Sequence, residues 1–367
     1  MRLYFQDPTD QEAPFLQERI LELCEGATRG AGAFAFVTSE GVGLLLKDEV
    51  FKRFATTGTF YLIVGVDEVT NVRALTALQE TSRELTGLTV KVFYHDDFPQ
   101  ALFHPKFCWF RHRRKAFLVV SSGNLTTKGL RGNWEAFAIS ELELTAADAL
   151  ETQWARWVEM HATHLRPLDD ENVLARAALN VRRRRPGPPV PAVEEEEEGG
   201  ETAEEQPVEP TPLHRVLVAE IPRASYRWNQ ANFDLNSFRN FFGAEPGTVR
   251  RVVLQHVDAS GMLGPLENRP SVSVRSRNFR FELDAAAGLR YPGEGRPIAV
   301  FVEIAPRTFR YRLLMPSDPQ HRIMNVFLDT MWRGRTDRMR RVITTTDVIQ
   351  REWPDSPIWR MPLEIEE

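Results

Sequence analysis

The first part of the chain alternates apolar runs of strand length with amphipathic runs of helix length. Strands are predicted at Met1–Phe5, Ala31–Val37, Phe60–Val66, Thr89–Tyr94 and Trp134–Ile139. The run Phe60–Val66 is apolar throughout, which is typical of a strand in a sheet that is covered on both faces. Pro14–Cys24 predicts a helix with one apolar face, and Asn71 predicts the N-cap of a second helix that ends at Leu85. Strands and helices in this order predict an α/β domain with a mixed sheet covered by helices.

A further helix is predicted to begin at Thr145, with Asp148 three residues on as part of a capping box. Its apolar positions share one face, and they predict either core packing or a contact between two copies: Leu150, Trp154, Trp157, Val158 and His161. His161 and His164 are spaced like a metal-binding pair. No acidic or thiol ligand is near them in the sequence, so we expect no metal there.

The pattern changes between residues 168 and 212. Arg182–Arg185 runs into a Pro-rich stretch, which is followed by Glu194–Glu198 and a segment rich in Glu and Pro. Such a composition buries too little apolar surface to fold, so it predicts a flexible linker. The arginines either touch nucleic acid or are simply solvated, and the glutamates form either a spacer or a mimic of phosphates. The linker separates a predicted domain at 1–167 from one at 213–367.

The part after Leu213 is rich in strand patterns. Runs of β type occupy Val249–Val257, Ser271–Leu283, Pro297–Ile304, Thr308–Met315 and Arg341–Ile349. Short helices are predicted around Phe238–Phe242, capped by Asp234 or Asn236, and at Ile323–Trp332. We therefore predict a mainly β domain, either a barrel or a sandwich, with two helices.

Candidate nucleic-acid contacts occur in this second part. The run Ser271–Leu283 alternates and places Arg275 and Arg277 on one face, and Trp228, Gln230 and Asn232 precede it. Arginines suit DNA phosphates, and amides suit base edges. The alternative reading is ordinary surface charge.

Charge is distributed unevenly over the 367 residues. The net charge is -5, but Leu213–Glu367 holds 23 Arg, no Lys and 18 acidic residues, so that part is +5 and the remainder is -10. The basic part favours a polyanionic partner. The two cysteines and the absence of a signal-peptide pattern predict a cytoplasmic protein, and no apolar run reaches the length of a membrane helix.

The residues with the clearest chemistry lie between Phe103 and Phe137. His104 and Lys106 are two apart and so share a strand face, as do Ser122 and Asn124 at the end of the next apolar run. Glu135 follows in the segment Asn133–Glu135. Two neighbouring strands could thus present an imidazole, an ammonium, a hydroxyl, an amide and a carboxylate to one point.

This set suits the cleavage of a phosphodiester. An imidazole can attack phosphorus and form a covalent intermediate. A lysine and an amide can hold the non-bridging oxygens, and a carboxylate can orient the imidazole. The set requires no metal or other cofactor.

The spacing resembles the signature of the phospholipase D superfamily, in which His-x-Lys is followed by an Asp and by Gly-Ser-x-Asn. His104, Lys106, Ser122 and Asn124 match, as do the Leu-Thr after Asn124 and the Asn-x-Glu that ends at Glu135. The match is closest to the nuclease branch and covers the first 165 residues or so. Two positions depart from it, because Arg111 stands at the position of the Asp and Ser121 at that of the Gly.

The resemblance implies a metal-independent nuclease that forms a phosphohistidine. The chain holds only one signature copy, and superfamily members of that kind pool two copies in a homodimer, so the second histidine is expected from a second chain. If each chain held its own site, His95 or His112 would be the nearest substitutes. The domain order is similar to that of restriction endonucleases with a C-terminal DNA reader like plant B3 domains. This similarity implies DNA as the substrate, a role in bacterial anti-phage defence, and a possible partner protein of a defence system.

Two other functions compete with this one. A lipid phosphodiesterase would share the signature, but the sequence has no amphipathic membrane helix or apolar lid. A non-catalytic module would use the first domain for dimerisation or DNA binding and leave the chemistry to a partner protein, and Arg111 in place of the Asp is its best support.

Overall fold

The computed structural model describes residues 1–96, 101–180, 214–223, 228–245, 247–271, 279–335 and 338–359. The chain divides into two compact units. The first unit comprises Met1–Pro8 and Ala13–Gln206, and the second comprises Thr9–Glu12 and Pro207–Glu367. Arg275, Arg277 and most of the predicted linker lie outside the described residues. No helix in the described ranges is both long and apolar enough to span a bilayer.

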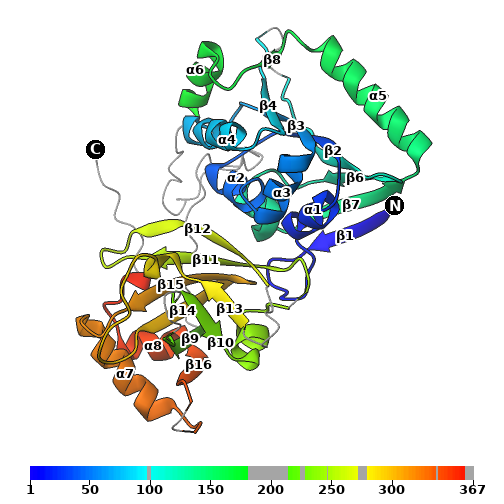
Figure 1. The fold of residues 1–367 in the computed structure, drawn as a ribbon. Helices are drawn as coiled ribbons and strands as arrows, with labels where there is room; N and C mark the ends of the chain where they lie inside the picture. Colours follow the sequence, from blue (N-terminus) through cyan, green and yellow to red (C-terminus); the bar gives the residue numbers. More distant parts are fainter. Residues whose placement is uncertain are drawn as a thin grey trace, which may run out of the picture. The chain divides into compact units, whose positions relative to one another are not determined.

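The first unit is built on an eight-stranded mixed sheet with the order β1-β7-β6-β5-β2-β3-β4-β8. Strands β2, β3 and β4 are parallel, and their neighbours run antiparallel to them. This confirms the predicted α/β architecture of the first part (Figure 1). The strands are β1 (Arg2–Gln6), β2 (Arg29–Phe34), β3 (Thr59–Gly65), β4 (Leu88–Phe93), β5 (Lys106–Arg111), β6 (Ala116–Ser121), β7 (Glu135–Leu142) and β8 (Leu165–Arg166).

Helices cover this sheet unequally. The helical segments are α1 (Leu16–Cys24), α2 (Ser39–Leu45), α3 (Glu49–Thr57), α4 (Val72–Glu84), the π-helical turn η1 (Lys128–Gly132), α5 (Leu144–Met160) and α6 (Glu171–Leu179). Figure 1 shows α5 set apart from the cluster of α1–α4. On the α3 side, Phe54, Phe60 and Phe110 form a close aromatic cluster. On the α5 side, Trp154 packs edge-on against Tyr61 and Phe107.

Helix α5 lies on the sheet without being buried by it. Ala147 is its one fully buried residue, although the helix spans 17 residues. Its N-terminal half is held by ion pairs, because Arg111 Nη2 lies 2.8 Å from Asp148 and Arg111 Nη1 lies 3.2 Å from Glu151. Arg29, the cross-strand partner of Arg111, also pairs with Glu151, at 2.7 Å. The predicted capping box is wrong, because the helix begins at Leu144 with no side-chain cap and Asp148 binds arginine instead.

One further prediction of the first part needs correction, and two helices were missed. Helix α6 occupies residues that we assigned to the linker, and the Asp170 side chain caps it by accepting hydrogen bonds from the amides of Asn172 and Val173. Helices α2 and α3 were not predicted at all. The N-cap of α4 is confirmed, since the Asn71 side chain accepts a hydrogen bond from the Ala74 amide at 2.9 Å.

The second unit contains a six-stranded sheet, β12-β11-β15-β14-β9-β16, and a two-stranded ribbon of β10 and β13. Its elements are β9 (Arg215–Glu220), β10 (Gln230–Phe233), η3 (Ser237–Phe241), β11 (Arg251–Val257), β12 (Leu263–Pro270), β13 (Phe279–Glu282), η4 (Asp284–Ala286), β14 (Ile298–Ala305), β15 (Thr308–Leu314), α7 (Pro319–Met331), β16 (Arg341–Thr345), α8 (Thr346–Glu352) and η5 (Pro357–Trp359). The predicted strand at Arg341–Ile349 is thus half wrong, because its second half belongs to helix α8.

The six-stranded sheet is apolar on both faces. Leu217 and Phe301 face a core rich in phenylalanine, whereas Val216 and Val300 face a second core that includes residues of α7 and α8. This agrees with the period-two patterns of these strands. The short helical turn is held as predicted, because the Asp234 side chain accepts a hydrogen bond from the Ser237 amide at 2.8 Å.

Candidate active site

The predicted site residues of the first unit lie at one edge of its sheet. Strand β5 begins at Lys106, so His104 lies two residues before the strand, and its antiparallel neighbour β6 ends at Ser121, directly before Ser122. Strand β7 then begins at Glu135 beside the end of β6. Antiparallel neighbours begin and end at the same edge, so this topology gathers segments that are up to thirty residues apart.

His104 and Lys106 are in contact. The Lys106 Nζ atom lies 3.1 Å from Nδ1 and 2.9 Å from Nε2 of His104. An ammonium can only donate hydrogen bonds, so the ring nitrogen that receives this proton must carry its lone pair. A neutral imidazole can accept this hydrogen bond, and it is also the form that can act as a nucleophile or a base.

Phe36 joins His104 and Lys106 to Asn124. Its ring centroid lies 5.7 Å from that of His104 and 6.0 Å from Lys106 Nζ. Its backbone amide donates a hydrogen bond to Asn124 Oδ1 at 3.2 Å. Asn124 is only 3% exposed, so this bond fixes the amide plane. Sequence reasoning missed Phe36, because the pairing of β2 with β5 that places it is not visible in local patterns.

The backbone around Asn124 packs closely against the backbone at Gly129. A Cβ atom at Gly129 would overlap the backbone nitrogen of Asn124, and one at Gly123 would overlap the carbonyl of Gly129. Gln6 ties the same loop to β1, because its amide donates to the carbonyls of Gly129 and Asn133. The loop is therefore a rigid support for Asn124.

Ser122 and Glu135 form a second pair at this edge. The Ser122 hydroxyl donates to the Glu135 carboxylate, and Asn133 Nδ2 donates to the other carboxylate oxygen at 3.2 Å. The Ala136 amide donates to Ser122 Oγ at 3.0 Å. The carboxylate thus has Ser122 and Asn133 as its partners, and the orientation of His104 by Glu135 stays a prediction.

Arg111 lies at the opposite end of β5 from this edge. Five residues separate it from Lys106, which corresponds to about 16 Å along a strand. The arginine at the position of the signature Asp therefore acts on α5 and does not reach the reactive groups. The replacement of the signature Gly by Ser121 is also local, because its hydroxyl accepts a hydrogen bond from the Gly123 amide at 2.8 Å.

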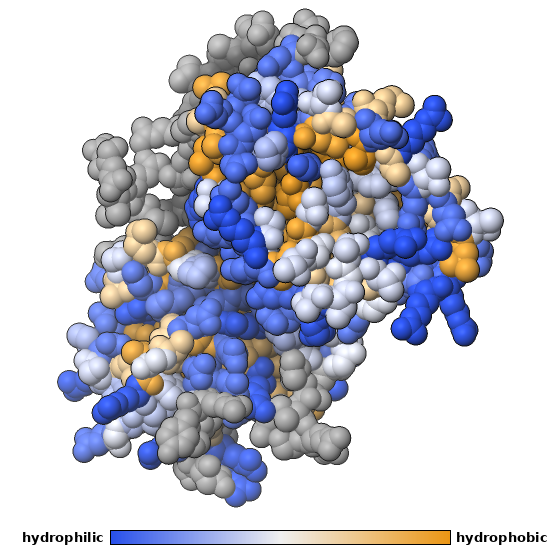
Figure 2. Space-filling view, turned by 45° about the horizontal axis from the view of Figure 1, so that its top comes forward, coloured by the Kyte–Doolittle hydropathy of each residue, from blue (hydrophilic) through white to orange (hydrophobic). Residues whose placement is uncertain are grey.

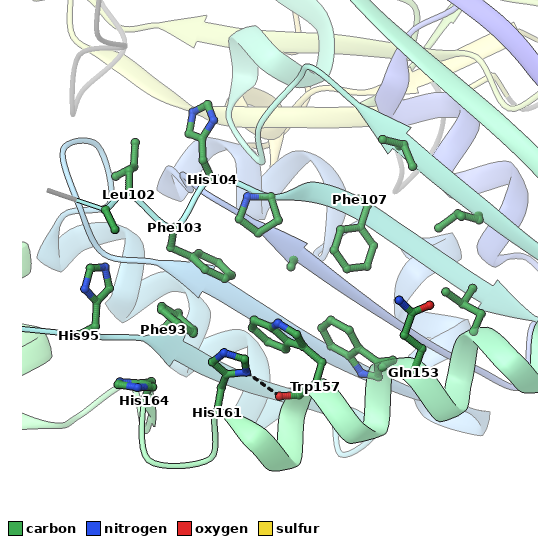
Figure 3. A pocket seen from close by; sticks show the side chains of 17 residues that line it. Phe93, His95, Leu102, Phe103, His104, Phe107, Gln153, Trp157, His161 and His164 are labelled. Carbon is green, nitrogen blue, oxygen red and sulfur yellow. Dashed lines mark hydrogen bonds between the residues drawn. The ribbon is translucent and has the colours of Figure 1, made fainter. Parts of the chain in front are cut away.

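A cavity of about 690 Å³ adjoins the same edge, between α5 and the sheet. His104, Phe103 and Pro105 line one side of it, and Trp154 and Trp157 of α5 line another (Figure 3). His95, His161 and His164 also line it, whereas His112 bonds to the Leu23 carbonyl at the far end of β5. The described residues contain no group of three potential metal ligands. Cys108 is a buried thiol, and burial raises its pKa.

The candidate residues of the second unit occupy different environments. Trp228 is 4% exposed and belongs to the phenylalanine-rich core, and its indole donates to the Leu289 carbonyl at 2.8 Å. This position favours a structural role for Trp228. Gln230 and Asn232 instead lie on the outward side of the β10–β13 ribbon, where Arg280 donates to Gln230 at 2.7 Å.

Comparisons with known proteins are sparse. No family model and no curated protein matches the sequence. One similar solved structure is Nuc from Salmonella typhimurium, a phospholipase D family member, at 11% identity over 45% of this chain and 95% of that one, with a TM-score of 0.33. NucT from Helicobacter pylori has 9% identity over 45% of this chain and 98% of its own, with a TM-score of 0.31. Yeast tyrosyl-DNA phosphodiesterase has 14% identity over 39% of this chain and 32% of its own, with a TM-score of 0.29. These values establish no family for the chain, so its function is argued from its own residues.

Proposed function

We propose that this chain is a phosphodiesterase that cleaves nucleic acid through a phosphohistidine. The observation that carries the proposal is the contact of His104 with Lys106 beside the buried Asn124, at the sheet edge that also holds Ser122 and Glu135. An imidazole, an ammonium and an amide at one edge supply a nucleophile and two groups that stabilise phosphate oxygens.

The proposed reaction has two steps. A ring nitrogen of His104 attacks phosphorus, so that an N–P bond forms and the P–O bond to the leaving oxygen breaks. A second imidazole gives its proton to that oxygen. Water then attacks phosphorus and gives its proton to the second imidazole, the N–P bond breaks, and His104 is restored. Lys106 turns from the imidazole to a phosphate oxygen when substrate binds, and Asn124 donates to another.

Chelation tests this mechanism most directly. Cleavage of a plasmid should persist in excess EDTA, because the charge on phosphate is stabilised by Lys106 and Asn124. His104→Asn and Lys106→Ala should each lower the rate by about a thousandfold or more, since each removes a group that is used in the transition state. Loss of cleavage on chelation and its return with magnesium would contradict the proposal. An unmodified chain without any activity would favour the non-catalytic module.

The second imidazole is proposed to be His104 of a second copy in a homodimer. A twofold axis brings the same residue from each copy to one place. When unmodified and His104→Ala chains are mixed, activity should fall as the square of the unmodified fraction. A fall in simple proportion would mean that each chain holds a complete site. His95, His161 and His164, which line the cavity with His104, would then be the candidates, and the distance of His112 from this edge argues against it.

The second unit is proposed to bind DNA and to restrict cleavage to particular sites, as in a restriction endonuclease that serves defence. Gln230, Asn232 and Arg280 share the outward side of the β10–β13 ribbon, where Gln230 bonds to Arg280 and Glu282 and would exchange these bonds for base edges while Arg280 binds phosphate. A chain that begins at Leu213 should bind duplex DNA with an affinity that falls as salt rises. Absence of binding at low salt would point to a module for protein docking instead.

A further inference from the structure

The cavity beside His104 has walls of aromatic rings. On the sheet side, Phe93 and Phe103 are stacked at a centroid distance of 4.4 Å, and Phe107 follows along β5. On the helix side, Trp154 stacks on Trp157 at 5.8 Å (Figure 3). The rings of α5 pack on the sheet, because Trp154 contacts Phe107 edge-on and Trp157 stacks on Phe93, and the cavity lies beside these contacts.

Polar groups with free hydrogen-bonding capacity interrupt these walls. His161 Nδ1 lies 2.9 Å from the Trp157 carbonyl oxygen, which can only accept, so Nδ1 carries the proton and Nε2 can accept from a ligand when the ring is neutral. Within the described part of the chain, the Gln153 amide has no hydrogen-bond partner, although it lines the cavity (Figure 3). The His95 Nδ1 atom is buried without a partner among the described residues.

These features fit a flat aromatic ligand with polar edges better than a lipid chain or an aliphatic side chain. Stacked aromatic rings bind flat π systems, and unpaired donors and acceptors match a heterocycle with both kinds of group at its rim. Apolar side chains also reach the surface of the first unit (Figure 2), among them Val120 at the cavity with 53% exposure.

We propose that this cavity binds one unpaired nucleobase of the nucleic acid, next to the phosphate that His104 attacks. This rests on the proposed function: His104 borders the cavity, its ring points away from Phe103 and Trp157 (Figure 3), and a base bound in the cavity would place its phosphate at the rim beside that ring. The base would stack on the partly exposed rings that line the cavity, with Gln153 and His161 at its edge. The substrate class that follows is single-stranded nucleic acid, or a duplex from which a base has been turned out.

Binding to a catalytically silent protein tests the cavity separately from the chemistry. In the full-length His104→Asn variant, the affinity for a fluorescein-labelled ten-residue thymidine oligonucleotide is measured by anisotropy. An abasic residue is then placed at each position in turn. At one position, loss of the base should weaken binding about tenfold or more, which corresponds to the loss of one stacked base.

Two substitutions that fill the cavity complete the test. Leu150→Trp on α5 and Val120→Trp on β6 should each weaken binding of the intact oligonucleotide to the level of the abasic one, and the abasic effect should vanish in both. Val120 is half exposed, so its variant tests the proposal even if Leu150→Trp does not fold. Met160→Ala, at a residue of α5 that is 65% exposed and does not line the cavity, is the control and should bind like the parent.

The possible outcomes separate the cavity from the proposed function. If the unmodified chain cleaves the oligonucleotide but no abasic position matters, or if the abasic effect persists in the filled variants, the base site is wrong while the nuclease stands. If the filled variants change the oligomeric mass and leave the abasic effect intact, the cavity is covered by a second copy of the chain. If the oligonucleotide is neither bound nor cleaved while plasmid cleavage persists in EDTA, the base site is wrong and the nuclease stands; if the plasmid is not cleaved either, both proposals fail.

Discussion

The attachment of α5 by Arg111 gives a prediction about local stability. Arg111→Met keeps the aliphatic part of the side chain and removes the charge that pairs with Asp148 and Glu151. We expect the N-terminal half of α5 to open more often in this variant, because Ala147 is the one fully buried residue of the helix and packing there cannot replace the ion pairs.

The magnitude follows from the exposure of the partners. The Arg111 and Glu151 side chains are 13% and 20% exposed, whereas Asp148 is 64% exposed. Exposed ion pairs contribute about 0.2–1 kcal/mol, and removal of one partner of a fully buried pair costs about 3–5 kcal/mol. The pair with Glu151 lies between these limits, but Glu151 keeps Arg29 as a partner at 2.7 Å, so we expect a loss of about 1 kcal/mol for Arg111→Met. This loss corresponds to roughly a fivefold increase in the open population of the helix.

Amide hydrogen exchange, read by mass spectrometry on peptides of α5, measures this population. A double-mutant cycle with Glu151→Gln isolates the pair, and its coupling free energy should be about 0.5–1 kcal/mol because Glu151 also pairs with Arg29. The helix α4 is an internal control, and its exchange should not change. A coupling below about 0.3 kcal/mol, or unchanged exchange in α5, would refute the role of Arg111 as an anchor. Arg111→Asp, which introduces the residue that the phospholipase D signature has at this position, should loosen α5 still more and should not raise any cleavage rate.

Two further predictions concern other buried polar groups. Asn124→Ala removes the acceptor of the Phe36 amide and should lower the free energy of unfolding by about 1–3 kcal/mol, in addition to its effect on cleavage. Denaturant titration measures this loss. Unchanged stability would mean that water replaces the lost acceptor. Burial and the nearby Arg312 lower the pKa of His256 to about 4. The unfolded chain therefore binds more protons between pH 6.5 and 4, and stability should fall as pH falls through this range, by roughly 1–3 kcal/mol after allowance for partial exposure. His256→Gln should flatten this part of the pH profile of the melting temperature, and an identical profile would contradict the assignment.

Strands and helices with a clear period were predictable from the sequence. The apolar strand β3 and the capped helix α4 each follow a local rule, and both were placed within one or two residues. Helix α8 was taken for a strand because its first residues, Thr346 to Val348, follow directly on a β-branched strand. Its start depends on a distant contact, in which the Thr346 amide and hydroxyl both bond to the His214 carbonyl.

The site was predictable only in part for a similar reason. His104, Lys106, Ser122 and Asn124 lie at one sheet edge because antiparallel neighbours along the chain begin and end there, which a sequence shows directly. Phe36 arrives from β2, whose pairing with β5 bridges more than seventy residues. The cavity was equally hidden, since the apolar face of α5 suggests a packed core and reveals nothing about how closely that face approaches the sheet.

The two departures from the superfamily signature can now be separated from the chemistry. The Arg111 guanidinium binds carboxylates of α5 at the end of β5 that lies away from Lys106. The Ser121 hydroxyl binds the amide of Gly123 and turns the chain toward Asn124. Neither group replaces a nucleophile or a ligand of phosphate. Both hold the elements that border the reactive edge, α5 on one side and the loop of Asn124 on the other. Under the proposed function, a substitution at either position should therefore change how substrate is held before it changes the attack on phosphorus, and Arg111 loses its value as support for an inactive module.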